Sequence, residues 1–151
     1  MIPPALLVEG LVIAREQRRI VDRVDLCLMP GELVSIHGPS GAGKTTLLLT
    51  LAGLLRAARG RVTVAGYELS RLTPRERAQR LAIATQSPML PSDLTVLDLV
   101  RLGRLPHEAP AKSFIHRMWR RDTDAEASVQ QAIVVVGLTK LARCTLDSLS
   151  G

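Results

Sequence analysis

Eight consecutive residues, 38–45, combine three glycines with a lysine and a hydroxyl group in the pattern G-x-x-x-x-G-K-[ST]. Glycine has no Cβ, so these positions allow the backbone to curl through positive φ angles. Such a curl turns successive N–H groups toward one point and forms a nest for anionic oxygens. The Lys44 ammonium adds a mobile positive charge, and the Thr45 hydroxyl adds an oxygen ligand for a hard cation. The pattern therefore predicts a phosphate cradle with a magnesium ligand beside it.

A strand before this loop and a helix after it must hold the cradle in place. Residues 33–37 are a short apolar run after a Pro30-Gly31 turn signal, which predicts a buried strand. Residues 46–55 are rich in Leu and contain no proline, which predicts a helix whose N-terminus points at the cradle. This context identifies the motif as the phosphate-binding loop (P-loop) of the P-loop NTPases. The nucleotide-binding residues predicted from it are Gly38, Pro39, Ser40, Gly41, Ala42, Gly43, Lys44, Thr45 and Thr46.

Antiparallel strands are predicted on both sides of the P-loop. Residues 5–14 and 20–29 lean toward β structure and are joined by the polar residues 15–19, so they predict a hairpin. Residues 60–66 alternate in polarity and end in a glycine turn, which predicts a further antiparallel strand. Residues 81–85 predict a short apolar strand that ends at Gln86.

Three capping signals predict helices that begin near residues 73, 95 and 123. Thr73 precedes a proline and stands three residues before a glutamate, while Thr95 stands three residues before an aspartate. A third signal begins at Thr123 and opens a helix that is stopped by a glycine at position 137. The apolar face predicted for that last helix consists of Val129, Ile133 and Val136.

Composition limits the class of protein. The chain has 151 residues, of which 46% are hydrophobic and 23% charged, so it is long enough for one globular domain with a core. The net charge of +6 would suit an anionic partner, but only 2% of the residues are aromatic, which leaves few stacking platforms for single-stranded nucleic acid. No apolar run is long enough to span a bilayer. Two cysteines indicate a reducing compartment, and we expect Cys27 and Cys144 to be buried.

Taken together, the motifs resemble an ABC transporter ATP-binding subunit. The resemblance depends on the Pro30-Gly31-Glu32 lead-in, the P-loop, Gln86 at the end of a strand, and Leu149-Ser150-Gly151, which matches the start of the family's L-S-G-G-Q signature. It implies an α/β fold with a RecA-like P-loop NTPase core, an N-terminal antiparallel β subdomain and an inserted α-helical subdomain. Within one truncated nucleotide-binding domain, residues 1–86 would form the β subdomain and core, 87–148 the helical subdomain, and 149–151 the start of the signature.

The resemblance also implies roles for individual residues. Lys44 and Gln86 would act in catalysis, and Thr45 and Gln86 would contact Mg²⁺ bound with ATP. Ser150 and Gly151 would touch the γ-phosphate of the ATP held by an opposite subunit. The implied partners are a second ATP-binding subunit, an integral-membrane permease and, indirectly, a substrate-binding protein, with no nucleic acid. The implied location is the cytoplasmic face of the cell membrane.

One segment points to a subfamily, and one position departs from the family pattern. Residues 95–107 resemble the T-V-x-x-x-V-x-x-G-R-x-P-H segment of importers for iron-siderophores, haem and cobalamin. Arg15 stands where the family usually has an aromatic side chain that stacks on adenine. Its guanidinium could stack on the base through a cation–π contact or point into water. Base selectivity and the direction of transport are therefore left open.

Three functional readings remain at the level of sequence. The first is an energy-coupling ATPase subunit of a membrane importer. The second is an ABC-type ATPase that acts on nucleic acid, and the third is a nucleotide-binding chain without turnover. The printed sequence stops before the Walker B strand and its catalytic glutamate would appear, so we expect it to lack the C-terminal part of the core and to hydrolyse ATP poorly or not at all. The basic residues 112–121 could touch lipid or the permease, or form a solvated loop.

Overall fold

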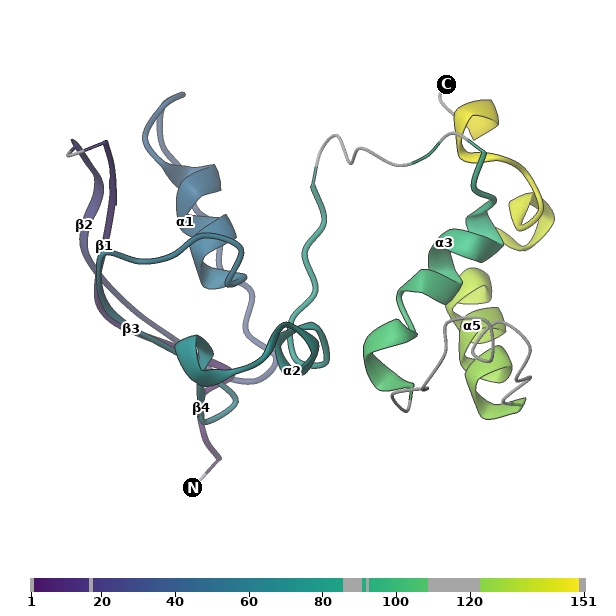
Figure 1. Cartoon of the computed structure of the whole chain (residues 1–151), viewed down its shortest axis with the longest axis horizontal. Coiled ribbons are helices and arrows are strands. Elements are labelled where there is room, and N and C mark those ends of the chain that lie inside the picture. The colour runs from purple at the N-terminus through teal and green to yellow at the C-terminus, as the bar shows by residue number, and fades with distance from the viewer. Residues whose placement is uncertain (1, 17, 86–90, 92, 109–122, 150–151) are drawn as a thin grey trace. The chain divides into compact units, whose positions relative to one another are not determined.

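The computed structural model describes residues 2–16, 18–85, 91, 93–108 and 123–149. By its internal contacts the chain divides into a first unit that ends at Ile83 and a second unit that begins at Ala84. Figure 1 shows the strands β1 to β4 with α1 and α2 in the first unit, and α3 with α5 in the second. Among the described residues, none of the helices has the length and apolar character needed to cross a membrane.

The first unit contains a four-stranded antiparallel sheet in the order β2-β1-β3-β4. Strand β1 is Leu6–Arg15 and β2 is Arg18–Leu28, which confirms the predicted hairpin but extends both strands toward its tip. Strand β3, Arg59–Val64, confirms the strand predicted at 60–66. The sequence did not indicate the two-residue strand β4, Tyr67–Glu68, which follows a tight turn.

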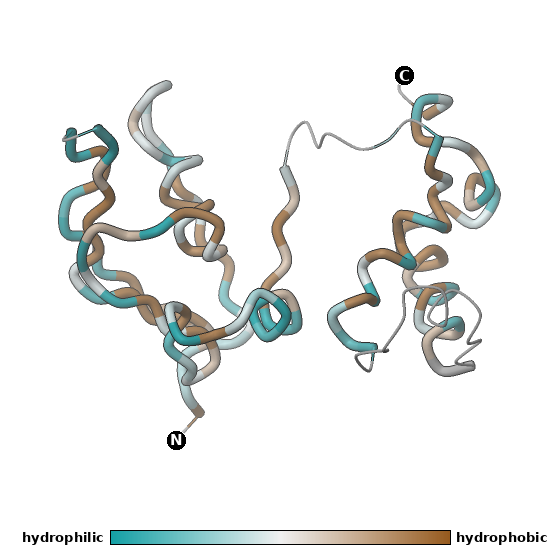
Figure 2. The backbone as a smooth tube through the Cα atoms, viewed as in Figure 1, coloured by the Kyte–Doolittle hydropathy of each residue, from teal (hydrophilic) through white to brown (hydrophobic). Residues whose placement is uncertain are grey.

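Helix α1, Lys44–Leu51, follows the P-loop, and its Leu47 and Leu51 side chains belong to the core that includes residues of the sheet. Figure 2 shows the hydrophobic residues of α1 and of the strands in brown. The predicted helix was longer, reaching residue 55. It ends earlier because Gly53 takes a φ of 73°, a left-handed value that stops an α-helix. The buried core of this unit consists of Val8, Leu11, Ile13, Leu47, Leu51, Val62, Val64 and Leu69.

Helix α2, Pro74–Ala78, has the capping box that the sequence predicted. The Thr73 hydroxyl accepts a bond from the Glu76 N–H, and the Glu76 carboxylate accepts one from the Thr73 N–H at 2.8 Å. A short 3₁₀ helix, η1 (Leu69–Arg71), precedes it. Arg77 of α2 donates to the carbonyl oxygen of Gly53 at 2.5 Å, which places a positive charge at the end of α1, where the helix dipole is negative.

Two predicted strands are absent from the part of the chain that the structure describes. Residues 33–37 and 81–85 belong to no strand, and neither pairs with any strand of the sheet. A strand is defined by its ladder of hydrogen bonds to a neighbour, and these segments take part in no such ladder among the described residues. Leu33 is accordingly 93% exposed, although Ile36 packs against the core of the unit.

The second unit is built on α3, Val96–Leu102, and α5, Thr123–Val135, which pack against each other. The described residues of this unit also form three short 3₁₀ helices, η2 (Leu105–His107), η3 (Thr139–Leu141) and η4 (Leu146–Leu149). Val129 and Ile133 are buried, as the predicted apolar face requires. The prediction was wrong for Val136, which is 61% exposed, because the helix ends at Val135 and the chain turns away.

The two cysteines are less buried than the sequence led us to expect. Cys27 is exposed, and Cys144 is half-buried. Cys27 lies on β2, which is an edge strand of the sheet, so part of that strand faces water rather than a neighbour. Both thiols are free.

Candidate phosphate-binding site

The P-loop has the backbone shape that its glycines predict. Gly38, Gly41 and Gly43 have φ values of 156°, 79° and 87°. At Gly43 there is also no room for a side chain, because an added Cβ would lie 2.7 Å from Ile20 Cγ2 and 3.3 Å from Val21 Cγ2. Strand β2 therefore rests directly on the P-loop, at the residue where α1 begins.

Helix α1 begins with free hydrogen-bond donors. Its first bond runs from the Leu47 N–H to the Gly43 carbonyl oxygen at 2.8 Å, so the N–H groups of Lys44, Thr45 and Thr46 precede the helical ladder. No side chain caps this end, and the first turn contains no acidic residue. Unpaired N–H groups at the positive end of the helix dipole attract an anion.

The Lys44 side chain folds back over the loop. Its ammonium donates to the carbonyl oxygens of Gly38 at 2.8 Å and Pro39 at 2.7 Å. An ammonium has three donors, so the loop carbonyls occupy two of them and one is left for another oxygen. The positive charge is thus held above the nest of N–H groups, where phosphate oxygens would lie.

A cleft of about 470 Å³ opens over the P-loop. Its lining consists of Ser40, Gly41, Ala42, Gly43, Lys44, Thr45 and Thr46 together with Arg18, Arg19 and Ile20 of β2. All the predicted P-loop residues except the first two line this cleft, and Thr45 is exposed there. Backbone N–H groups, an ammonium and a hydroxyl are the donor set that a Mg²⁺-bound nucleotide triphosphate requires.

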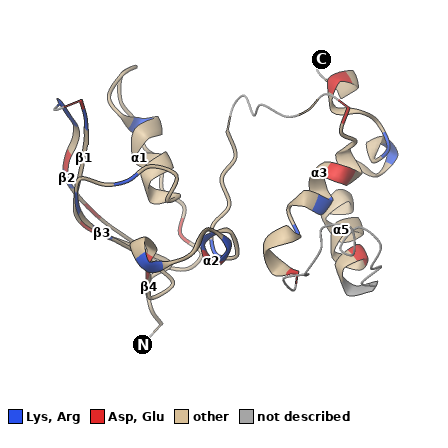
Figure 3. Cartoon of the chain, viewed as in Figure 1, with Lys and Arg blue, Asp and Glu red and all other residues tan. Residues whose placement is uncertain are grey.

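The sequence interpretation did not assign Arg18 or Arg19 to this cleft; the arginine that it singled out, Arg15, was considered for the base rather than the phosphates. Arg15 ends β1 and pairs with Arg18 in the ladder, but it is not among the cleft-lining residues. The sequence assigned residues 15–19 to a polar connection. In the structure, β2 already begins at Arg18, so Arg18 and Arg19 are held by the sheet. Figure 3 shows Lys and Arg positions in blue near the tip of the β1–β2 hairpin. Extending the predicted second strand by two residues before Ile20 would have included both arginines.

Several predicted site residues lie outside the described residues. They are Gln86, Ser150 and Gly151, and the basic stretch 112–121 lies outside as well. Leu149, the first residue of the predicted signature, ends the 3₁₀ helix η4.

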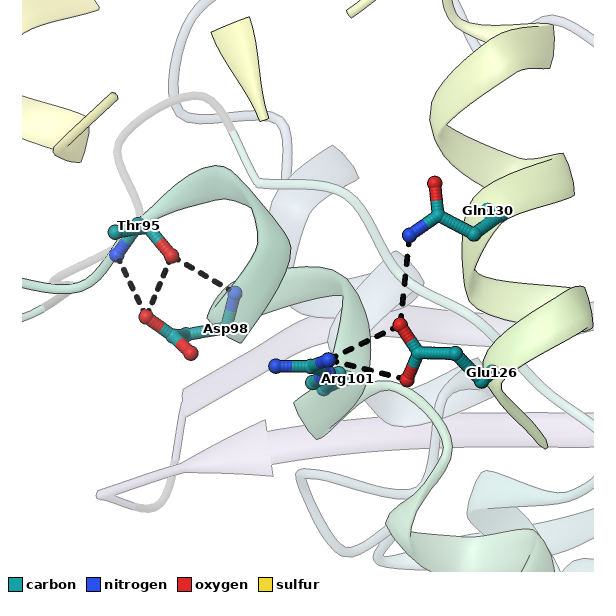
Figure 4. Close-up of polar contacts among 5 residues, drawn as sticks. All are labelled: Thr95, Asp98, Arg101, Glu126 and Gln130. Atoms are coloured by element: carbon teal, nitrogen blue, oxygen red, sulfur yellow. Dashed lines mark hydrogen bonds and ion pairs between the residues drawn. The ribbon is translucent and has the colours of Figure 1, made fainter. Parts of the chain in front are cut away.

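Figure 4 shows two groups of polar contacts in the second unit, one between Thr95 and Asp98 and one among Arg101, Glu126 and Gln130. The Thr95 hydroxyl donates to Asp98 at 2.5 Å, and the Thr95 N–H donates to the same carboxylate at 3.2 Å. These bonds, the first above all, hold the pKa of Asp98 below its usual value. Arg101 of α3 pairs with Glu126 of α5 at 3.0 Å, and Gln130 donates to the same carboxylate at 3.4 Å.

A glycine-lined loop between a sheet and a helix, with a lysine and a threonine at the start of that helix, defines the P-loop nucleotide-binding class. Within it, this chain belongs to the ABC transporter family, whose family model matches residues 21–151. The α/β P-loop NTPase fold predicted from the sequence is confirmed by solved structures. A nucleotide-free ATP-binding cassette from an ABC transporter aligns with a TM-score of 0.77 at 25% identity, over 97% of this chain and 59% of that one. The ADP conformation of MJ1267, an ATP-binding cassette of an ABC transporter, aligns with a TM-score of 0.76 at 26% identity, over 98% of this chain and 59% of that one.

The curated relatives are named for hemin import, ferric enterobactin transport and siderophore transport. The hemin import ATP-binding protein HmuV of Myxococcus xanthus is 41% identical over 72% of this chain and 40% of its own length. The ferric enterobactin transport ATP-binding protein FepC of Escherichia coli is 32% identical over 95% of this chain and 50% of its own. The probable siderophore transport system ATP-binding protein YusV of Bacillus subtilis is 34% identical over 97% of this chain and 51% of its own. The chain thus spans about half the length of these relatives or less.

Proposed function

We propose that this chain binds Mg-ATP at the P-loop and belongs to the ATP-binding subunit of an importer for an iron-siderophore, haem or cobalamin type of substrate. The observation that carries the ATP site is the open start of α1, with unpaired N–H groups and the Lys44 ammonium over one cleft. The names of the hemin and siderophore relatives support the importer assignment.

Each predicted site residue would contact a different part of the nucleotide. The P-loop N–H groups and Lys44 would hold the β- and γ-phosphates, Thr46 would reach the α-phosphate, and Arg15 would contact the base. Thr45 and Gln86 would hold Mg²⁺, which when bound supplies positive charge at the phosphate oxygens. Gln86 would also orient the attacking water. Ser150 and Gly151 would contact the γ-phosphate held by a second subunit, so that ATP joins the two.

The partners follow from the proposed role. A second ATP-binding subunit would complete the site. An integral-membrane permease would be driven by the movement of the two ATP-binding subunits, and it would hold both subunits at the inner face of the membrane. A substrate-binding protein would act through that permease. The transported substrate would be selected by the permease and the binding protein.

A second candidate, nucleotide binding without turnover, is favoured by one observation on these 151 residues. No carboxylate lines the described cleft, so no general base stands there to take a proton from water. We expect these residues alone to bind ATP and hydrolyse it slowly or not at all. Turnover by this chain at a rate abolished by Lys44→Ala would contradict that expectation.

The ATP site is tested by comparing Lys44→Ala with Lys140→Ala, which removes a lysine from the second unit. We expect Lys44→Ala to weaken Mg-ATP binding by about 100-fold in calorimetry, since it removes a charge-assisted contact to phosphate. Lys140→Ala should bind as the parent does. In cells, the Lys44 variant should also lose uptake of the transported substrate at an unchanged protein level. Equal ATP affinities in the two variants would contradict the proposal.

A further inference from the structure

One wall of the phosphate cleft is formed by the start of β2 and not by the P-loop. Arg18, Arg19 and Ile20 contribute this wall. Its position is fixed by packing, because Ile20 and Val21 leave no space for a side chain at Gly43. The two arginines therefore stand next to the point where the P-loop passes into α1.

A bulge in the hairpin produces this close approach. Val21 pairs with Ile13 and Arg19 pairs with Ala14, so Ile20 is an extra residue in β2. A bulge bends its strand and re-aims side chains, and bulges are frequent beside functional sites. Here the bulge brings two consecutive residues against Gly43 and sets Arg18 and Arg19 at the cleft.

The two arginines differ in whether a nearby carboxylate offsets the positive charge of the guanidinium. Arg19 Nη1 lies 3.3 Å from both carboxylate oxygens of Asp22, so that carboxylate offsets its charge. Among the described residues, no ion pair or side-chain hydrogen bond engages Arg18, which is exposed. Arg18 is thus the uncompensated guanidinium in the β2 wall of the cleft.

We propose that Arg18 is a further phosphate contact of this site: its guanidinium pairs with phosphate oxygens of the bound nucleotide, from the β2 wall of the cleft. A guanidinium presents a planar fork of donors that matches two phosphate oxygens, and it stays charged at all relevant pH values. The P-loop supplies the N–H nest and Lys44, and Arg18 adds a second cation from the sheet. This inference rests on the proposed ATP site and adds a residue to it.

The test uses a ligand that has phosphates but no base. We expect Arg18→Ala to weaken binding of Mg-ATP by about tenfold, and of Mg-tripolyphosphate by the same factor, at low salt. Arg18→Lys keeps the charge and should recover part of the loss. Arg59→Ala, which removes an exposed arginine of β3 outside the cleft, should bind both ligands as the parent does. Circular dichroism melting curves verify that each variant is folded.

The outcomes separate this inference from the ATP site itself. A loss for ATP with unchanged tripolyphosphate binding would mean that Arg18 contacts the base, and it would overturn the phosphate assignment. Unchanged binding of both ligands to Arg18→Ala, with binding lost in Lys44→Ala, would overturn only the role of Arg18. A parent protein that binds neither ligand would overturn both proposals.

Discussion

Helices α1 and α3 begin in opposite ways. At the start of α3, the N–H groups of Val96 and Leu97 donate to the carbonyl oxygens of Cys144 at 3.1 Å and Ala142 at 2.9 Å. The Asp98 N–H donates to the Thr95 hydroxyl at 3.2 Å, so the first turn is fully paired. At the start of α1 a left-handed glycine replaces the cap, and no side chain accepts from the first turn.

This difference corresponds to two different roles: α3 supports the fold of the second unit, and α1 would bind phosphate in the proposed function. Unpaired donors at a helix start cost free energy unless water or a ligand satisfies them, so a chain normally closes them with a cap. Both α2 and α3 have complete capping boxes. In the proposed function, a phosphate group would satisfy the open start of α1. Three substitutions test this contrast, with an expected loss of stability that falls from Ile133→Ala through Gly43→Ala to Thr95→Ala.

In the second unit, which contains α3 and α5, the substitution with the largest expected effect is Ile133→Ala. Ile133 is 1% exposed in α5, so removing its side chain should lower the free energy of unfolding of the second unit by about 2–5 kcal/mol. Hydrogen exchange of the α5 amides measures the loss. Val134→Ala is a matched control on the same helix, because Val134 is 61% exposed and should change little. Similar exchange in the two variants would show that the packing of α5 has been misassigned.

The start of α1 is disrupted by the substitution Gly43→Ala. The new methyl group would need a left-handed φ and would collide with Ile20, so we expect a loss of about 2–4 kcal/mol in stability and of nucleotide binding. Gly41→Ala is the control, since Gly41 is also left-handed but has nothing within 4 Å of an added Cβ. It should cost only the backbone strain of about 1–2 kcal/mol in urea unfolding. If the two variants lost equal stability, β2 would not rest on Gly43.

The smallest effect concerns the cap of α3 and its dependence on pH. Thr95→Ala should cost the second unit about 1 kcal/mol at neutral pH. The pKa of Asp98 is lowered in the folded state, so its charged form stabilises the fold above its usual pKa of 3.8, and this contribution is lost as the pH falls below that value. Thr95→Ala should therefore flatten the acid limb of the stability curve.

Urea unfolding of the second unit at several pH values, with Asp98→Asn as the non-titrating control, measures this effect. The Asn variant should show the same flattened limb. An acid limb as steep as that of the parent in both variants would exclude Asp98 as its source.

Local patterns in the sequence predicted the parts of this fold that depend on local chemistry. The P-loop and the capping boxes at Thr73 and Thr95 are complete within a few residues, and all three form as predicted. Residues 33–37 have strand composition but lack a described neighbour, and composition cannot supply a ladder partner. Pairing between strands also decides which arginine reaches the cleft. The hairpin register, with its bulge at Ile20, places Arg18 and Arg19 in β2 and in the lining of the cleft, whereas the sequence assigned both to a polar connection.

We infer that the P-loop N–H groups of residues 40–46, among which those of Lys44, Thr45 and Thr46 are unpaired, receive the phosphates of a nucleotide. Amide hydrogen exchange, compared with and without saturating Mg-ATP, measures those groups directly. The account predicts that exchange slows at 40–46 and stays unchanged at Val96, Leu97 and Asp98, whose N–H groups are already paired. Unchanged exchange at 40–46, with ATP shown by calorimetry to be bound, would contradict it.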